Sequence, residues 1–167
     1  MKKRSGLVAL TLLLALSLCA CGGPGETQPS AVSMSQLQKT MLEADPSLTE
    51  MLSVTGDASD SASLFAYLSE LPYEKVDNFL LSYSSSGKAD EVAVIAVKNA
   101  ADVEEAARSL RAHVEQRRSL FRQYAPDQAT RVDQAQVFTS GPYAVLIIAD
   151  QGQAVKEAFE KAMPTAG

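Results

Sequence analysis

The sequence contains no tryptophan, one histidine and two cysteines, and both cysteines lie within the first 21 of its 167 residues. Because His113 stands alone, a metal site built on a histidine pair and a Ser-His-Asp arrangement with a spare base are both excluded. Beyond Cys21 there is no thiol, which excludes a disulfide, a redox pair and a cysteine-rich metal site from the rest of the chain. No P-loop, dinucleotide fingerprint or zinc-ligand spacing is present. We therefore predict no catalytic residue, metal or cofactor.

Positive charge is also scarce, because 15 lysines and arginines face 20 acidic residues and the net charge is −5. Removing residues 1–20 would take away three basic residues and no acid, so the remaining chain would carry −8. Nucleic acids and anionic membrane surfaces bind proteins through clustered Lys and Arg. The balance of charge predicts that nucleic acid is not a partner and that electrostatics alone do not hold the chain at a membrane.

The N-terminus has the order of an export signal. Basic residues in Met1–Arg4 precede an apolar run over Leu7–Leu18, which is shorter than the roughly 20 residues that cross a bilayer. The following Leu18-Cys19-Ala20-Cys21 resembles a bacterial lipobox, and this resemblance implies cleavage before Cys21 and a diacylglyceryl group on its sulfur. We expect residues 1–20 to be a lipoprotein signal peptide and the protein to be lipid-anchored at the extracytoplasmic face of the cell membrane. The alternative is an ordinary signal peptide that releases a soluble protein.

Composition divides the rest of the chain into three parts. Residues 21–34 are rich in Gly, Pro and Ser and are expected to form a flexible tether behind the lipid on Cys21. Residues 35–163 are enough for a single domain of ordinary size. Residues 164–167 are expected to be a disordered C-terminus.

Apolar spacing predicts an α+β domain with an antiparallel four-stranded sheet. Short helices are expected over 35–44 and 63–71, with most of 49–62 a loop. The core elements that follow are expected in the order ββαββα: strands over 78–84 and 91–98, a helix over 100–124, strands over 132–139 and 143–150, and a helix over 153–163. The two halves resemble each other in pattern, so a ββα duplication is an open alternative.

The strands over 91–98 and 143–150 are apolar on both faces and need cover on both sides. We expect the helices over 100–124 and 153–163 to cover one face, which leaves the short helices over 35–44 and 63–71 for the other. If these short helices leave part of that face bare, a partner has to complete the layer.

Charged residues on the helix over 100–124 are the main candidates for contact with an anion or a partner. Five arginines lie there: Arg108, Arg111, Arg117, Arg118 and Arg122. We single out Arg111, Arg118 and Arg122, while glutamates three or four positions away offer the alternative of ion pairs on a solvated helix face. His113, on the same helix beside its apolar stripe, is expected to have no catalytic role because the sequence indicates no partner for it.

A resemblance to a known family rests on two segments. The run Ser84–Val94 and the Arg/Glu-rich helix that ends in Phe121-Arg122-Gln123-Tyr124-Ala125-Pro126 resemble small Gram-positive lipoproteins catalogued as domain of unknown function 4358. The resemblance covers roughly residues 73–158. It implies the fold and an envelope location, and it supplies neither an activity nor site residues.

Three functional hypotheses follow. We favour a non-catalytic binding or interaction module at the cell surface, with a ligand, a protein partner or a second copy of the chain bound to it. One alternative is an envelope-polymer hydrolase or transferase that uses paired carboxylates. The other is an accessory protein that binds a small solute, although receptors of that kind usually close two lobes on their ligand.

Overall fold

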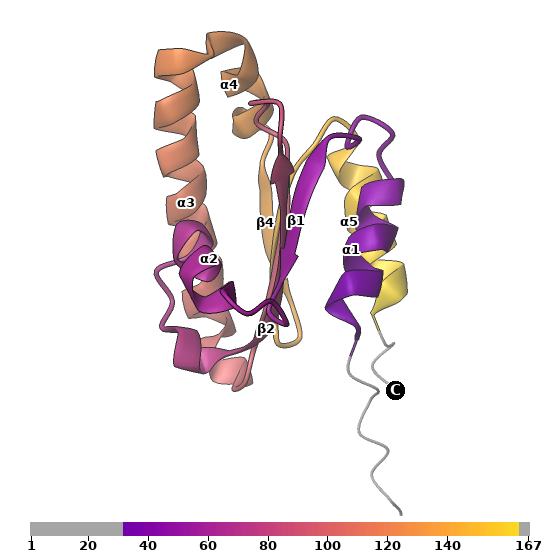
Figure 1. Ribbon diagram of the computed structural model, residues 1–167, viewed down its shortest axis with the longest axis vertical. Helices are drawn as coiled ribbons and strands as arrows, with labels where there is room; N and C mark the ends of the chain where they lie inside the picture. The colour runs from indigo at the N-terminus through magenta and orange to yellow at the C-terminus, as the bar shows by residue number, and fades with distance from the viewer. Residues whose placement is uncertain (1–31, 164–167) are drawn as a thin grey trace, which may run out of the picture. The chain divides into compact units, whose positions relative to one another are not determined.

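Five antiparallel strands form one sheet in the computed structural model, which describes residues 32–163 (Figure 1). The expected signal peptide, Cys21, most of the tether and the C-terminal residues 164–167 lie outside the described residues. The α+β class and the antiparallel sheet are confirmed. No helix within 32–163 has the length and apolar character needed to cross a bilayer.

The sheet has the order β1-β2-β3-β5-β4, so β2, β3 and β5 are interior strands and β1 and β4 are the edges. The strands are β1 Met51–Thr55, β2 Val76–Ser84, β3 Glu91–Val97, β4 Gln136–Ser140 and β5 Tyr143–Ile148. All residues of β3 are buried, as expected for a strand that is apolar on both faces. The registers Leu81↔Ala93 and Val94↔Val145 align the strands so that alternate residues face opposite helix layers.

The expectation of four strands was wrong by one, because β1 lies in the segment that was expected to be a loop. This strand is five residues long, pairs with β2 alone and is only partly buried. A short edge strand of this kind has no clear two-residue alternation, so its sequence carries little strand signal.

A further helix, α4 Pro126–Asp133, lies where the strand over 132–139 was expected to begin. Pro126 ends the preceding helix and starts the next one, because a proline at the first helical position loses no hydrogen bond. Val132 is therefore a buried residue of α4, and β4 starts only at Gln136.

Helices cover both faces of the sheet (Figure 1). One face, here called the α3 face, carries α2 Ser61–Leu68, α3 Val103–Tyr124 and α4. The other, the α5 face, carries α1 Met34–Glu43 and α5 Gly152–Ala162. The expected pairing of the two C-terminal helices on one face was wrong, because α3 and α5 lie on opposite sides. Strands that are apolar on both faces leave the side of each helix undetermined by local sequence.

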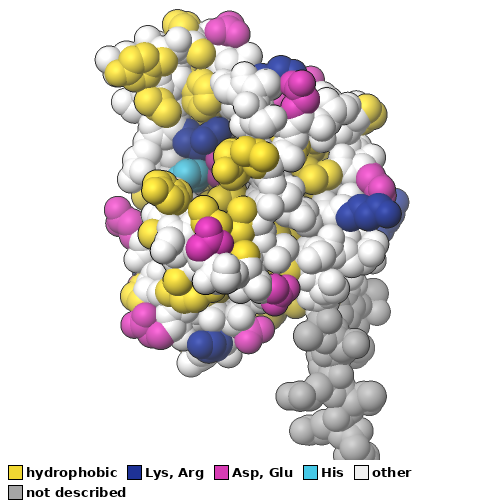
Figure 2. Space-filling model, in the orientation of Figure 1, with side chains coloured by type: hydrophobic (Ala, Val, Ile, Leu, Met, Phe, Trp, Pro, Cys, Tyr) yellow, Lys and Arg dark blue, Asp and Glu magenta, His cyan; other side chains and the backbone are white. Residues whose placement is uncertain are grey.

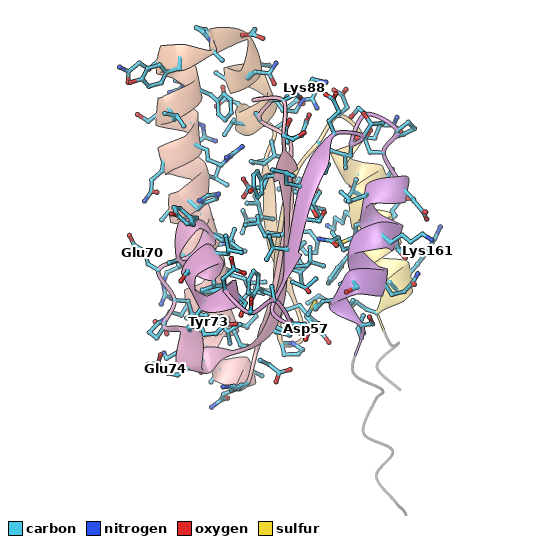
Figure 3. All side chains as sticks on the ribbon, in the orientation of Figure 1. Asp57, Glu70, Tyr73, Glu74, Lys88 and Lys161 are labelled. Carbon is cyan, nitrogen blue, oxygen red and sulfur yellow. The ribbon has the colours of Figure 1, made fainter. Side chains whose placement is uncertain are left out.

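The two faces bury separate apolar clusters. The α3 face buries Phe65, Phe79, Ile95, Leu110 and Leu146 among others. The α5 face buries, among others, Leu37, Leu80, Val94, Val145 and Phe159. Figure 3 shows side chains filling the space between the sheet and each helix layer. Each fully buried Leu, Val or Phe contributes about 1.5–3 kcal/mol to stability, so both layers are needed to hold the sheet.

Candidate functional site

A groove of about 610 Å³ lies on the α3 face between α2 and α3. It forms because α2 has 8 residues and α3 has 22, lengths of roughly 12 Å and 33 Å. The shorter helix leaves part of β1 and β2 without a covering helix. Figure 2 looks onto the β1 edge and shows hydrophobic side chains around a hollow in which the histidine and a basic side chain are visible.

The walls of the groove are mostly apolar. They are formed by Val54 of β1, Leu81 and Tyr83 of β2, Leu64, Tyr67 and Leu68 of α2, and Leu120 of α3. Tyr67 is 79% exposed and Leu120 is 51% exposed, so these two large side chains stand at the rim. Leu52 of β1 is also half exposed, and strand alternation places it on the same face as Val54. An occupant of the groove would therefore remove apolar surface from water.

One acidic and two basic side chains, Glu91, His113 and Arg117, lie together in the groove and are here called the polar trio. Glu91 begins β3, and its side chain is 3% exposed. His113 and Arg117 lie four residues apart on one side of α3. The Nε2 atom of His113 lies 2.8 Å from Oε1 of Glu91, and Nη1 of Arg117 lies 3.1 Å from Oε2. Both carboxylate oxygens of Glu91 are thus occupied by groups from α3.

Arg117 is held in place by further contacts. Its Nη2 donates a hydrogen bond to the carbonyl oxygen of Ala89 at 3.0 Å. Its guanidinium lies over the Phe121 ring, 5.1 Å from the ring centroid, in a cation–π arrangement. Its Nε is buried and has no hydrogen-bond partner among the described residues. The guanidinium stays charged at any ordinary pH, so the groove contains a fixed positive group.

The groove offers little for covalent or metal chemistry. Its lining side chains within 32–163 include no serine, threonine or cysteine, and Glu91 is their one carboxylate. Among the residues that the structure describes, no group of three or more His, Cys, Asp or Glu side chains is placed to hold a metal ion. The arrangement suits the binding of an apolar body with a polar group at one point.

A second charged cluster lies at the same end of β3 as Glu91, because Asp90 directly precedes that strand. Arg131 of α4 contacts Asp90 at 2.6 Å and Asp150 at 2.5 Å. Burial raises the pKa of Asp90 above its usual range, despite the opposing effect of the Arg131 and Lys88 charges. Asp90 and Asp150 are therefore joined through a shared guanidinium that ties α4 to the sheet.

Asp45, in the segment after α1, connects the two helices of the α5 face. Its carboxylate accepts hydrogen bonds from the backbone N–H groups of Gln151 at 2.7 Å and Ser47 at 2.9 Å. Burial acts to raise the pKa of Asp45, but these hydrogen bonds outweigh it and hold the pKa below its usual range. This contact fixes the end of α1 to the start of α5.

The three arginines that were singled out from the sequence lie away from the groove. Arg118 and Arg122 come together on Asp133 of α4, at 2.6 Å and 3.4 Å, and Arg118 also pairs with Glu115. Arg111 lies 3.7 Å from Glu104. Arg111 and Arg118 also line a shallow depression of about 410 Å³ beside β4. Their contact with an anion or a partner stays a prediction.

Sequence reasoning missed the polar trio because the partner of His113 lies 22 residues away on a strand. Two signals were available. His113 and Arg117 have helical i,i+4 spacing beside the apolar stripe, and Glu91 opens a strand that is otherwise apolar. A charged residue at such a position requires a partner when it is buried.

A model of the family described as "Domain of unknown function (DUF4358)" matches residues 52–149. No curated protein and no solved structure gives a significant match to the chain. The matched range covers more than half of the sequence, from β1 to the residue after β5. It includes all of the groove and the polar trio, and it leaves out both helices of the α5 face.

Proposed function

The chain belongs to the DUF4358 family. We propose that it is a non-catalytic binding module and that it binds a small, largely apolar ligand between α2 and α3. The observation behind the proposal is the groove of about 610 Å³, whose walls are largely apolar and whose polar lining is the polar trio together with Gln116. Small-molecule sites typically have volumes of 300–1,000 Å³, apolar linings and a few placed polar groups.

The polar trio favours binding over catalysis. A general base needs a free lone pair that faces the substrate, but both oxygens of Glu91 are already paired with His113 and Arg117. The paired-carboxylate alternative needs a second acid, and the described groove-lining residues provide Glu91 alone. A protein ligand that buries a few apolar side chains there is the remaining competitor, and the experiment below separates the two.

We further propose that the module is held at the extracytoplasmic face of the cell membrane by lipid on Cys21. The signal-like N-terminus and the lipobox motif support this location. Two acyl chains are enough for stable anchoring, and a −8 chain has no electrostatic attraction to an anionic membrane. Feeding cells a labelled fatty-acid analogue should mark the full chain, and unchanged labelling of Cys21→Ala would contradict the anchor.

The groove is tested with a photoactivatable alkyl probe added to cells that produce the full chain. A 12-carbon chain with a mid-chain diazirine should crosslink to groove residues such as Leu64 and Leu81, as mapped by mass spectrometry. Leu120→Asp should abolish this labelling, because it places a charge at the rim.

Tyr124→Asp is the matched control for this variant. Tyr124 is also exposed on α3, at 72%, and does not line the groove. Labelling that is equal in both variants, or that falls outside the groove, would overturn the proposed function. Groove labelling that persists only when the alkyl probe is part of a peptide would indicate a protein ligand instead.

A further inference from the structure

Resting on the proposed function, we infer that the apolar ligand ends in a carboxylate, which binds against Arg117 at the polar trio. Some polar atoms of the trio are already paired within the protein, and the others are left to a ligand.

Both carboxylate oxygens of Glu91 are occupied by other members of the trio. Glu91 is 97% buried by side-chain area and receives His113 on one oxygen and Arg117 on the other. An ammonium group on a ligand would find no unpaired carboxylate in the groove and would meet the guanidinium of Arg117. Cationic ligands are therefore disfavoured.

The base of the trio retains hydrogen-bonding capacity. A guanidinium has five N–H donors. Arg117 donates one hydrogen bond from Nη2 to the Ala89 carbonyl oxygen, and its Nη1 forms an ion pair with Glu91 at 3.1 Å. Beyond these contacts, Nη1 and Nη2 have no acceptor among the described residues, and Arg117 lines the groove. A planar fork of this kind matches a carboxylate, and charge-assisted hydrogen bonds are about twice as strong as neutral ones.

The chain as a whole does not attract anions, since its net charge is −5. Selectivity for a carboxylate would therefore come from Arg117 in the groove and not from the general surface. An alcohol of the same length would gain the same apolar burial without the charged contact. This contact is expected to favour the carboxylate about 10-fold to 100-fold.

The test uses the full chain in the membranes of producing cells and the alkyl diazirine probe with a carboxylate end. Dodecanoate, dodecan-1-ol and dodecylamine are compared as competitors of groove labelling. Dodecanoate should compete at a concentration about 10-fold to 100-fold below dodecan-1-ol, and dodecylamine should be the weakest of the three.

Arg117→Gln should remove the preference for dodecanoate, and Arg122→Gln should keep it. Arg122 is a matched control because it lies on the same helix, is 62% exposed and pairs with Asp133 outside the groove. If Arg117→Gln fails to accumulate as folded protein, the competitor series on the unaltered chain decides the question alone.

Two results would overturn the inference, and they can be told apart. Groove labelling that dodecan-1-ol blocks as well as dodecanoate would refute the carboxylate and leave the binding module standing. Absence of groove labelling by any probe would refute both.

Discussion

On the α5 face, α1 and α5 lie side by side over the central strands and bury Val94, Val145 and Phe159 completely. On the α3 face, the long α3 lies beside the much shorter α2, and the groove opens between them over β1 and β2. Both layers cover one sheet, and its strands β3 and β5 are buried on both faces over nearly all of their length. The difference therefore arises from the lengths of the covering helices.

The two faces also differ in how their buried polar groups are paired. On the α5 face, Gln38 donates to Ser82 at 2.9 Å and Ser82 meets Ser53 at 3.0 Å, a chain of neutral hydrogen bonds. The buried carboxylate of Asp45 on that face is held by backbone N–H groups. On the α3 face, the buried carboxylate of Glu91 forms an ion pair with Arg117. A buried ion pair seldom stabilises a fold more than well-packed apolar residues do. We infer that the contacts of the α5 face serve stability, whereas the buried ion pair on the α3 face serves a purpose other than stability.

The largest effect on stability is expected on the α5 face. Phe159 is completely buried, with its ring 5.6 Å from Phe138 and 6.3 Å from Tyr143 between centroids. Phe159→Ala should lower the free energy of unfolding by about 3–5 kcal/mol, measured by urea denaturation. Leu120→Ala at the groove rim should cost less than about 1 kcal/mol, because Leu120 is half exposed. Equal losses would contradict the contrast between the faces.

The next effect concerns the polar trio. Glu91→Ala should destabilise the protein by about 2–4 kcal/mol, because it leaves Arg117 partly buried without its partner. Replacing Glu91, His113 and Arg117 together by leucine should leave the free energy of unfolding within about 1 kcal/mol of the original value or raise it. A triple variant as unstable as Glu91→Ala would show that the trio is structural.

A smaller effect is expected at Asp45, which joins the two helices of the α5 face. Asp45→Ala removes two hydrogen bonds to a carboxylate and should cost about 1–3 kcal/mol near pH 6. The pKa of Asp45 is lowered on folding, so its contribution is present above the ordinary value of 3.8 and is lost as the pH falls below it. The stability difference between the original protein and the variant should therefore shrink between pH 6 and pH 2, and a constant difference would contradict this origin.

The smallest effect is expected on the outer side of α3. Arg122 is 62% exposed and shares Asp133 with Arg118. Arg122→Gln should change the free energy of unfolding by less than about 0.5 kcal/mol, because exposed ion pairs contribute little. A larger loss in urea denaturation would show that this end of α3 is more firmly held to α4 than its exposure indicates.

Elements with strong local signals were predicted from the sequence. The helix expected over 35–44 is α1, and its N-cap Ser33 accepts a hydrogen bond from Gln36. Both hairpins are present, and Gly87 and Gly141 in their turns have φ values of 80° and 53°, a conformation that favours glycine. The expected helix over 100–124 corresponds to α3 with a short 3-10 turn before it.

The remaining features depend on contacts between distant segments. The edge strand β1 is stabilised by pairing with β2, and the side on which α5 packs is set by the whole layer. The groove depends on the gap between α2 and α3. This gap cannot be predicted from the apolar pattern of either helix alone. His113 was noticed in the sequence, but its pairing with Glu91 requires the packing of α3 on the sheet.

The α5 face is covered by the first and the last helix of the described domain, α1 and α5. During synthesis all five strands are made before α5, so Val145 and Ile147 remain without their cover until residue 162 has been added. We therefore expect folding to be completed only when the last helix has been made. A chain that stops before Gly152 would contain the whole region matched by the family model, and it would expose an apolar sheet face that chaperones and proteases recognise.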